Sequence, residues 1–180
     1  MMQDHLQKTI AQEAHCSGIG VHSGKKVNLA IKPAPINHGI KFVRTDLPSQ
    51  PIVSARFNKV VDTSLATVIG EDGFIISTIE HLMAALAGLT IDNALVEVDN
   101  YELPIMDGSA GPFVAMIKSA GIKIQSAPRY FFVIQEPVEL EEKDKFVGIY
   151  PAPHFRLTCT IEYSKCPLIR TQTQDMIVNK

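Results

Sequence analysis

The sequence predicts an α/β (α+β) fold, in which a sheet-plus-helices domain at residues 1–126 is followed by an incomplete second copy at residues 127–180. Short alternations of apolar and polar residues, separated by turn residues, fill most of the first part, and two segments there have the apolar spacing of helices. The second part has mainly strand patterns. In both parts a strand, a turn and a strand end in Pro-Ala-Pro, which suggests a weak internal repeat.

Strands are predicted for most of the first domain, beginning with a strand, a turn and a strand between Lys8 and Pro35. Within this stretch Val27, Leu29 and Ile31 alternate with polar residues, which is the period of a half-buried strand. Clusters of Asp, Gly, Pro and Ser mark the turns that follow. The further predicted strands lie at 39–44, within 51–70, at 74–76 and at 94–98, with turns at 46–48, 62–64 and 71–73.

The first predicted helix covers residues 77–88, STIEHLMAALAG. Ser77 and Glu80 have the S-x-x-E spacing of a capping box, in which each side chain bonds to the backbone N–H of the other residue. Apolar residues at i, i+3, i+4 and i+7 would face a core, and Gly88 would end the helix. The apolar residues are Ile79, Leu82, Met83 and Leu86.

A second helix is predicted after the loop at 101–111, with Pro112 at its first position and Gly121 at its end. Turn-forming residues at 126–130 separate this helix from the strands of the second part, and the domain boundary is therefore predicted there. The apolar side of the second helix consists of Phe113, Val114, Ile117 and Ala120.

The composition is typical of a globular protein, with 180 residues of which 46% are hydrophobic and 20% charged. A net charge of −2 without a basic run argues against nucleic-acid binding. No apolar stretch is long enough for a transmembrane segment, and residues 1–10 lack the apolar run of a secretion signal, so we expect a cytoplasmic protein. The cysteines show no C-x-x-C spacing and predict neither a disulfide framework nor a structural zinc site.

His81 points almost directly away from the apolar stripe of the first predicted helix, and Glu80 lies on the flank of that stripe. The positions on the opposite side from the stripe, Ala84, Ala85 and Gly88, are small, whereas a face exposed to water would normally carry long polar side chains. Two interpretations stay open. Either the pair faces an occupied crevice and is functional, or Glu80 only caps the helix and His81 is an ordinary surface residue.

A zinc hydrolase site would use both members of this pair, because neutral imidazole is a zinc ligand and a neighbouring carboxylate can accept the proton of a water. Such a site needs about three protein ligands, and no second ligand has a credible spacing in the sequence. His22, in the glycine-flanked turn GVHSGKK, is the best further candidate, although polar turn residues usually bond to backbone. Asp107 is another candidate, and its alternative role is that of a turn or cap residue.

Residues 18–35, 44–48 and 77–114 resemble stretches of one family, the UDP-3-O-acyl-N-acetylglucosamine deacetylases, which are zinc amidases of lipid A biosynthesis. The family's first-domain signature resembles residues 77–114, STIEHLMAALAGLTIDNALVEVDNYELPIMDGSAGPFV. GIGVHSGKKVNLAIKPAP at 18–35 and RTDLP at 44–48 fit the same family in order, so the resemblance covers essentially the whole chain. It implies two similar units, each a two-layer arrangement of a sheet and a pair of helices, with the helix layers packed together and the site between them.

The resemblance also implies roles for individual residues. His81 matches the family's first zinc ligand, so Zn²⁺ is the implied cofactor, and Glu80 matches the general base. The implied reaction removes the N-acetyl group of UDP-3-O-(3-hydroxyacyl)-N-acetylglucosamine, a UDP-linked acylated glucosamine, and releases acetate. DTSLATVI matches a stretch that lines the family's site, so Ser64, Leu65 and Ala66 are expected to touch the substrate or its acyl chain.

The second part of the chain departs from the family pattern. The family's other two zinc ligands, a histidine and an aspartate four residues further on, and a later histidine that acts as general acid are expected beyond residue 180. Cys166 stands where the family commonly has the histidine of a His-Pro pair. We therefore expect an N-terminal part of such an enzyme, inactive until the missing C-terminal half of the second domain completes it. The alternative is a truncated, non-catalytic relative that acts as a binding or structural module.

Overall fold

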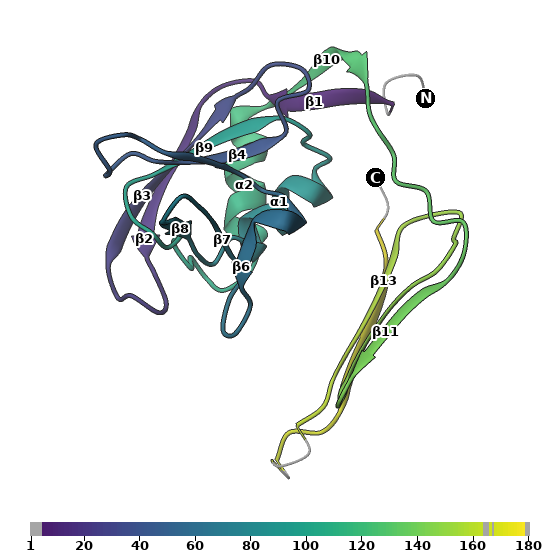
Figure 1. Ribbon diagram of the computed structural model, residues 1–180. Coiled ribbons are helices and arrows are strands. Elements are labelled where there is room, and N and C mark those ends of the chain that lie inside the picture. The colour runs from purple at the N-terminus through teal and green to yellow at the C-terminus, as the bar shows by residue number, and fades with distance from the viewer. Residues whose placement is uncertain (1–4, 164–165, 167, 179–180) are drawn as a thin grey trace. The chain divides into compact units, whose positions relative to one another are not determined.

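The computed structural model describes residues 5–163, 166 and 168–178, and their contacts divide the chain into two units (Figure 1). The first unit ends at Arg129 and the second begins at Tyr130. Among the described residues, both α-helices lie in the first unit. The predicted boundary after residue 126 falls inside the last strand of the first unit, because that strand continues to Pro128.

A five-stranded sheet forms one layer of the first unit. All neighbouring strands in it are antiparallel except β9 and β4, which are parallel. In spatial order the strands are β2 (Ala14–Ile19), β3 (Lys26–Pro33), β9 (Ala94–Val98), β4 (Ile40–Arg44) and β5 (Ile52–Ser54).

The alternation in β3 determines which face of this sheet is buried. Val27, Leu29 and Ile31 are at most 2% exposed, whereas Lys26 and Asn28 between and beside them are exposed. Successive side chains of a strand point to opposite faces, so the apolar residues share one face. This confirms the predicted strand and its phase.

Two smaller sheets complete the first unit. One pairs the first strand of the unit with its last strand, and the other is a three-stranded antiparallel sheet that precedes the first helix. The first consists of β1 (Leu6–Ile10) and β10 (Ile122–Pro128), and the second of β6 (Val60–Asp62), β7 (Val68–Glu71) and β8 (Phe74–Ile76), preceded by the 3-10 turn η1 (Phe57–Lys59).

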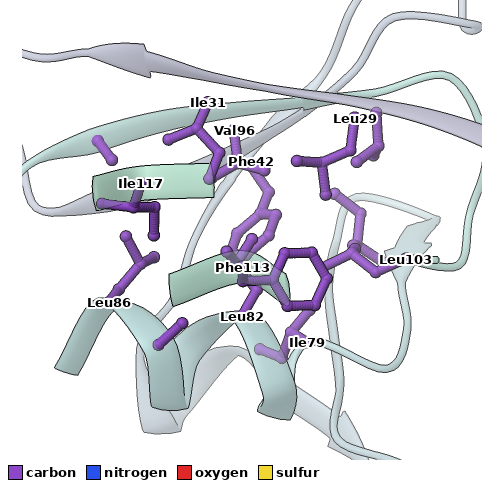
Figure 2. Close-up of a cluster of buried hydrophobic side chains, with 14 of the residues drawn as sticks. Leu29, Ile31, Phe42, Ile79, Leu82, Leu86, Val96, Leu103, Phe113 and Ile117 are labelled. Atoms are coloured by element: carbon purple, nitrogen blue, oxygen red, sulfur yellow. The ribbon is translucent and has the colours of Figure 1, made fainter. Parts of the chain in front are cut away.

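The second layer of the first unit consists of α1 (Glu80–Gly88) and α2 (Gly111–Ala120), whose apolar residues pack against the buried face of the sheet. Figure 2 shows this core, with the side chains of both helices directed toward those of the strands. Full burial of one large apolar side chain stabilises a fold by about 1.5–3 kcal/mol, so the core holds both helices firmly. The labelled residues are Leu29, Ile31, Phe42, Ile79, Leu82, Leu86, Val96, Leu103, Phe113 and Ile117. The mixed α/β class predicted from the sequence is confirmed.

The start of α1 differs from the prediction. The helix begins at Glu80, and no side chain caps its first turn. Ser77 instead forms a backbone bridge with Glu102, and the Glu80 carboxylate bonds to the backbone of Thr67. The predicted capping box is therefore wrong, because the backbone around Ser77 is used in pairing with a segment distant in the sequence.

The open side of α1 is narrower than predicted. Ala84 and Gly88 are exposed, as expected, but Ala85 is 1% exposed and belongs to the core. α1 packs against α2 as well as against the sheet, so the helix buries more of its circumference than one stripe. The prediction that Ala85 lies on the open side is wrong.

α2 ends before Gly121, as predicted, and begins at Gly111, one residue before the predicted start at Pro112. Pro112 lies in the first turn, where a backbone N–H would have no acceptor within the helix, so that the lack of an N–H in proline costs nothing. Gly121 has a φ of 77° and donates its N–H to the carbonyl of Lys118, which ends the helix.

The second unit consists, in its described residues, of two antiparallel hairpins. β11 (Val138–Glu142) pairs with β12 (Lys145–Ile149), and β13 (Arg156–Ile161) pairs with β14 (Gln172–Ile177). Arg156 and Asp175 form an ion pair across the second hairpin, and hydrogen bonds from Arg156 and Thr158 lower the pKa of Asp175 to about 2. Among the described residues of the whole chain, no helix has the length and apolarity needed to span a membrane.

Candidate functional site

The segment Tyr101–Asp107 connects the parts of the first unit that carry the candidate residues. Ser77 donates its N–H to the carbonyl of Tyr101 at 2.7 Å and accepts the N–H of Leu103 at 3.0 Å. On its other side, the segment donates the N–H of Ile105 to the carbonyl of Ile19 at 3.0 Å. The 101–107 segment therefore bonds both to the end of β2 and to the residues before α1.

Glu80 lies in the first turn of α1 and is partly buried. Its Oε2 accepts the backbone N–H of Thr67 at 3.1 Å, so the carboxylate is directed to the loop between β6 and β7. Ser64, Leu65 and Ala66 belong to that loop. The structure thus brings the predicted general base close to the loop predicted to touch the substrate.

The loop itself exposes an apolar side chain. Asp62 accepts hydrogen bonds from the backbone N–H of Ser64 at 3.0 Å and from its hydroxyl at 2.7 Å, which lower the pKa of Asp62. Leu65, at the following position, is 81% exposed, and Ala66 is partly buried. The polar residue is thus held within the turn while Leu65 is free to contact an apolar group.

His81 follows Glu80 and is also partly buried. It lies within electrostatic range of Asp107, whose pKa is lowered mainly by the hydroxyl of Ser109 and, to a smaller extent, by the charge of His81. Asp107 accepts the Ser109 N–H at 2.9 Å and its hydroxyl at 2.8 Å. Asp107 therefore forms the turn before α2, which is the structural role considered for it as an alternative. It also interacts electrostatically with His81.

His22 is exposed in the turn after β2. Its backbone N–H donates to the Glu102 carboxylate at 2.9 Å, and the N–H of Ser23 donates to the same carboxylate at 2.7 Å. The predicted turn is present, but the bond that fixes it comes from the backbone of His22. The 101–107 segment thus carries Asp107 and also binds the turn that carries His22.

Two residues of this arrangement escape prediction from the sequence. Thr67 acts through its backbone N–H, for which no side-chain pattern exists. Glu102 is 1% exposed, whereas glutamate is almost never fully buried without a partner, so a surface position is the ordinary expectation. The only signal was the number of small and turn-forming residues around His22, which indicates a backbone available to an acceptor.

The predicted zinc ligand among the described residues is His81. His81 presents an imidazole, the type of donor that zinc prefers. Among residues 5–163, 166 and 168–178, no three His, Cys, Asp or Glu side chains are grouped so that they could hold a metal ion. All three cysteines are free, and burial raises the pKa of the Cys16 thiol. These residues therefore do not form a complete three-ligand metal site.

Comparison with known proteins identifies relatives along nearly the whole chain. The family model described as LpxC: UDP-3-O-acyl N-acetylglycosamine deacetylase matches residues 7–180. A UDP-3-O-acyl-N-acetylglucosamine deacetylase of Myxococcus xanthus is 50% identical over 170 residues, which are 94% of this chain and 54% of the relative. Deacetylases of the same name from Shewanella oneidensis and Shewanella baltica are 47% identical over 168 residues, 93% of this chain and 55% of each relative. The chain spans about half the length of the curated relatives it matches, and it belongs to the LpxC family of UDP-3-O-acyl N-acetylglycosamine deacetylases.

Proposed function

We propose that this chain supplies the first-domain half of a deacetylase site that removes the N-acetyl group of UDP-3-O-(3-hydroxyacyl)-N-acetylglucosamine. The observation that carries the proposal is the adjacent pair Glu80 and His81 in the uncapped first turn of α1, with the Glu80 carboxylate directed to the 64–66 loop by Thr67. The names of the relatives support the reaction class. The product of the reaction would be acetate and a free amine.

In this proposal Glu80 is the general base. The bond from Thr67 occupies Oε2 and orients the carboxylate, while Oε1 accepts no hydrogen bond from the described residues and can take the proton of a water. His81 would hold a Zn²⁺ ion together with ligands outside the described residues. When bound, that ion would supply Lewis acidity that polarises the amide carbonyl.

The remaining candidate residues would contact the substrate. The exposed Leu65 and the neighbouring Ala66 suit an acyl chain, and Ser64 keeps their loop in shape through Asp62. His22 and Asp107 offer polar side chains on segments held by one stretch of backbone, which suits the UDP-sugar portion. That the protein acts in the cytoplasm and has no nucleic-acid partner stays a prediction from the sequence.

The proposal is tested with two proteins, the 180-residue chain and a hybrid in which these residues replace the matching part of the Myxococcus xanthus relative. We expect the hybrid to bind zinc and to release acetate from the UDP-linked substrate, and we expect His81→Ala in the hybrid to lose both properties. We expect the 180-residue chain alone to be inactive, because its described residues contain no group of three side chains that could hold a metal ion and affinity builds with ligand number.

Metal analysis and acetate release decide between the alternatives. Deacetylation with stoichiometric zinc by the 180-residue chain alone would contradict the proposal that the site in this chain is incomplete. A folded hybrid that binds the UDP-linked substrate without hydrolysing it would favour the alternative of a non-catalytic binding module.

A further inference from the structure

Glu102 is a buried residue of the 101–107 segment, and its carboxylate bonds to the His22 turn and to Thr78. Only 1% of the residue is exposed, and its oxygens accept the N–H groups of His22 and Ser23 at 2.9 and 2.7 Å. The hydroxyl of Thr78 donates a third, longer bond at 3.4 Å. No Lys or Arg among the described residues forms an ion pair with Glu102. A buried carboxylate is tolerated only when such donors replace water, so these segments and the charge depend on each other.

The turn after β2 is shaped around this carboxylate. A Cβ atom on Gly20 would lie 2.3 Å from Oε2 of Glu102, which is far below any contact distance between atoms that are not bonded. Gly20 also donates its N–H to the carbonyl of Lys25 and accepts the N–H of Gly24, so it closes the turn. A larger residue at position 20 would therefore have to displace the Glu102 carboxylate.

Thr78, two residues before the start of α1, adopts a strained backbone conformation next to Glu102. Thr78 has a φ of 59°, which a β-branched residue rarely adopts, and it is 3% exposed. Such a conformation persists where the surroundings hold it. Here the pairing of Ser77 with the 101–107 segment and the bond from the Thr78 hydroxyl to Glu102 hold it. Glu80 and His81 follow two and three residues later, so the geometry at Thr78 sets where their side chains begin.

We propose that Glu102 is a positioning residue of the deacetylase site, whose buried carboxylate holds the His22 turn and Thr78, which leads into α1, in one fixed arrangement. The catalytic consequence rests on the proposed function, whereas the arrangement itself does not. Burial tends to raise the pKa of Glu102, but the bonds from Ser23 and His22 outweigh it and keep that pKa below its ordinary value. The carboxylate therefore stays charged at neutral pH and can accept all of its donors.

Glu102→Gln tests the proposal, because an amide presents N–H groups to donors that need an acceptor. Glu97→Gln is the matched control, since Glu97 lies on β9 and pairs with Lys32 on the sheet. In spectra of the histidine imidazoles of the 180-residue chain, we expect Glu102→Gln to shift the signals of His22 and His81 and to leave those of His38 in place. In the hybrid we expect kcat to fall about 10- to 100-fold, which is typical of a displaced catalytic group. Glu97→Gln should change neither quantity.

Gly20→Ala is the second variant, because it keeps the charge of Glu102 but occupies the space of its carboxylate. We expect it to shift the same two imidazole signals and to lower kcat in the hybrid. Folded variants with unmoved His81 signals and an unchanged kcat would overturn the proposal, and so would the loss of the fold in both variants, which would make Glu102 a folding residue. An inactive unsubstituted hybrid would instead refute the proposed function, while the imidazole spectra would still decide the role of Glu102.

Discussion

Glu80 begins α1, yet its carboxylate bonds to Thr67 and not to its own helix. Loss of a capping residue would lower stability, whereas loss of a general base would lower the rate. In the hybrid we expect Glu80→Gln to reduce kcat about 100- to 10,000-fold, because the amide can accept the Thr67 N–H but cannot take up a proton. Initial rates of acetate release measure this effect. If the rate stayed normal and the free energy of unfolding fell by about 1 kcal/mol, which is typical of a lost cap, Glu80 would be structural.

The pKa of Asp107 should depend on the hydrogen bonds within the turn before α2. Hydrogen bonds from Ser109 lower its pKa, and the charge of His81 adds to this effect. Because the folded pKa lies below the unfolded one, the stabilising contribution is present above the unfolded pKa and is lost as the pH falls through the folded pKa. Ser109→Ala removes the hydroxyl donor, so the pKa of Asp107 should rise toward its ordinary value in an NMR titration. Ser119→Ala, further along α2, is the control, and identical titrations for all three proteins would contradict the prediction.

The candidate residues could be selected from the sequence to different degrees. The helical phase of residues 77–88 separates Glu80 and His81 from the apolar stripe, and Asp-Gly at 107–108 indicates a turn. Both inferences use neighbours in the sequence. Glu102 could not be selected, because its donors at His22 and Ser23 are about 80 positions away and are backbone groups. The functional roles of the selected residues stay predictions.

At the scale of the elements, the packing of α1 against the sheet is what fixes the Glu80 and His81 backbone. Leu82 is 0% exposed in the core, whereas Ser119 is exposed on α2. We expect Leu82→Ala to lower the free energy of unfolding by about 2–5 kcal/mol, because it leaves a cavity, and Ser119→Ala to change it by less than about 0.5 kcal/mol. Urea denaturation of the 180-residue chain measures both. Equal effects of the two substitutions would mean that α1 does not pack as described.

The elements were predictable where local pattern determines them. The alternation at Val27, Leu29 and Ile31, the strand Ala94–Val98 and the ends of α2 follow from periodicity, proline and glycine. The order of the sheet was not predictable, because β9 lies between β3 and β4 through pairings that cross long stretches of chain. The false capping box has the same cause: the backbone of Ser77 pairs with the 101–107 segment, and local spacing carries no information about that pairing.

At the scale of the whole molecule, the candidate site is collected from stretches distant in the sequence. All the candidate residues lie in the unit that ends at Arg129. The 101–107 segment carries Asp107 and bonds both to the turn of His22 and to the residues before Glu80 and His81. The 64–66 loop joins them through Thr67 and Glu80. Because these links are hydrogen bonds to backbone, substitutions of side chains elsewhere on the surface should leave the arrangement intact.

Large apolar side chains on the surface predict the association behaviour of the whole chain. Phe57 and Leu65 are 92% and 81% exposed, and Phe132 in the second unit is 93% exposed. Exposed apolar residues favour self-association, because contact between molecules removes them from water. We expect the 180-residue chain to sediment as a concentration-dependent mixture of species, and we expect Phe57→Ser with Leu65→Ser to shift that mixture toward the monomer. Ser119→Ala, a substitution of an exposed polar residue on α2, should leave the mixture unchanged. A chain that stays monomeric at every concentration would show that these apolar residues do not drive association.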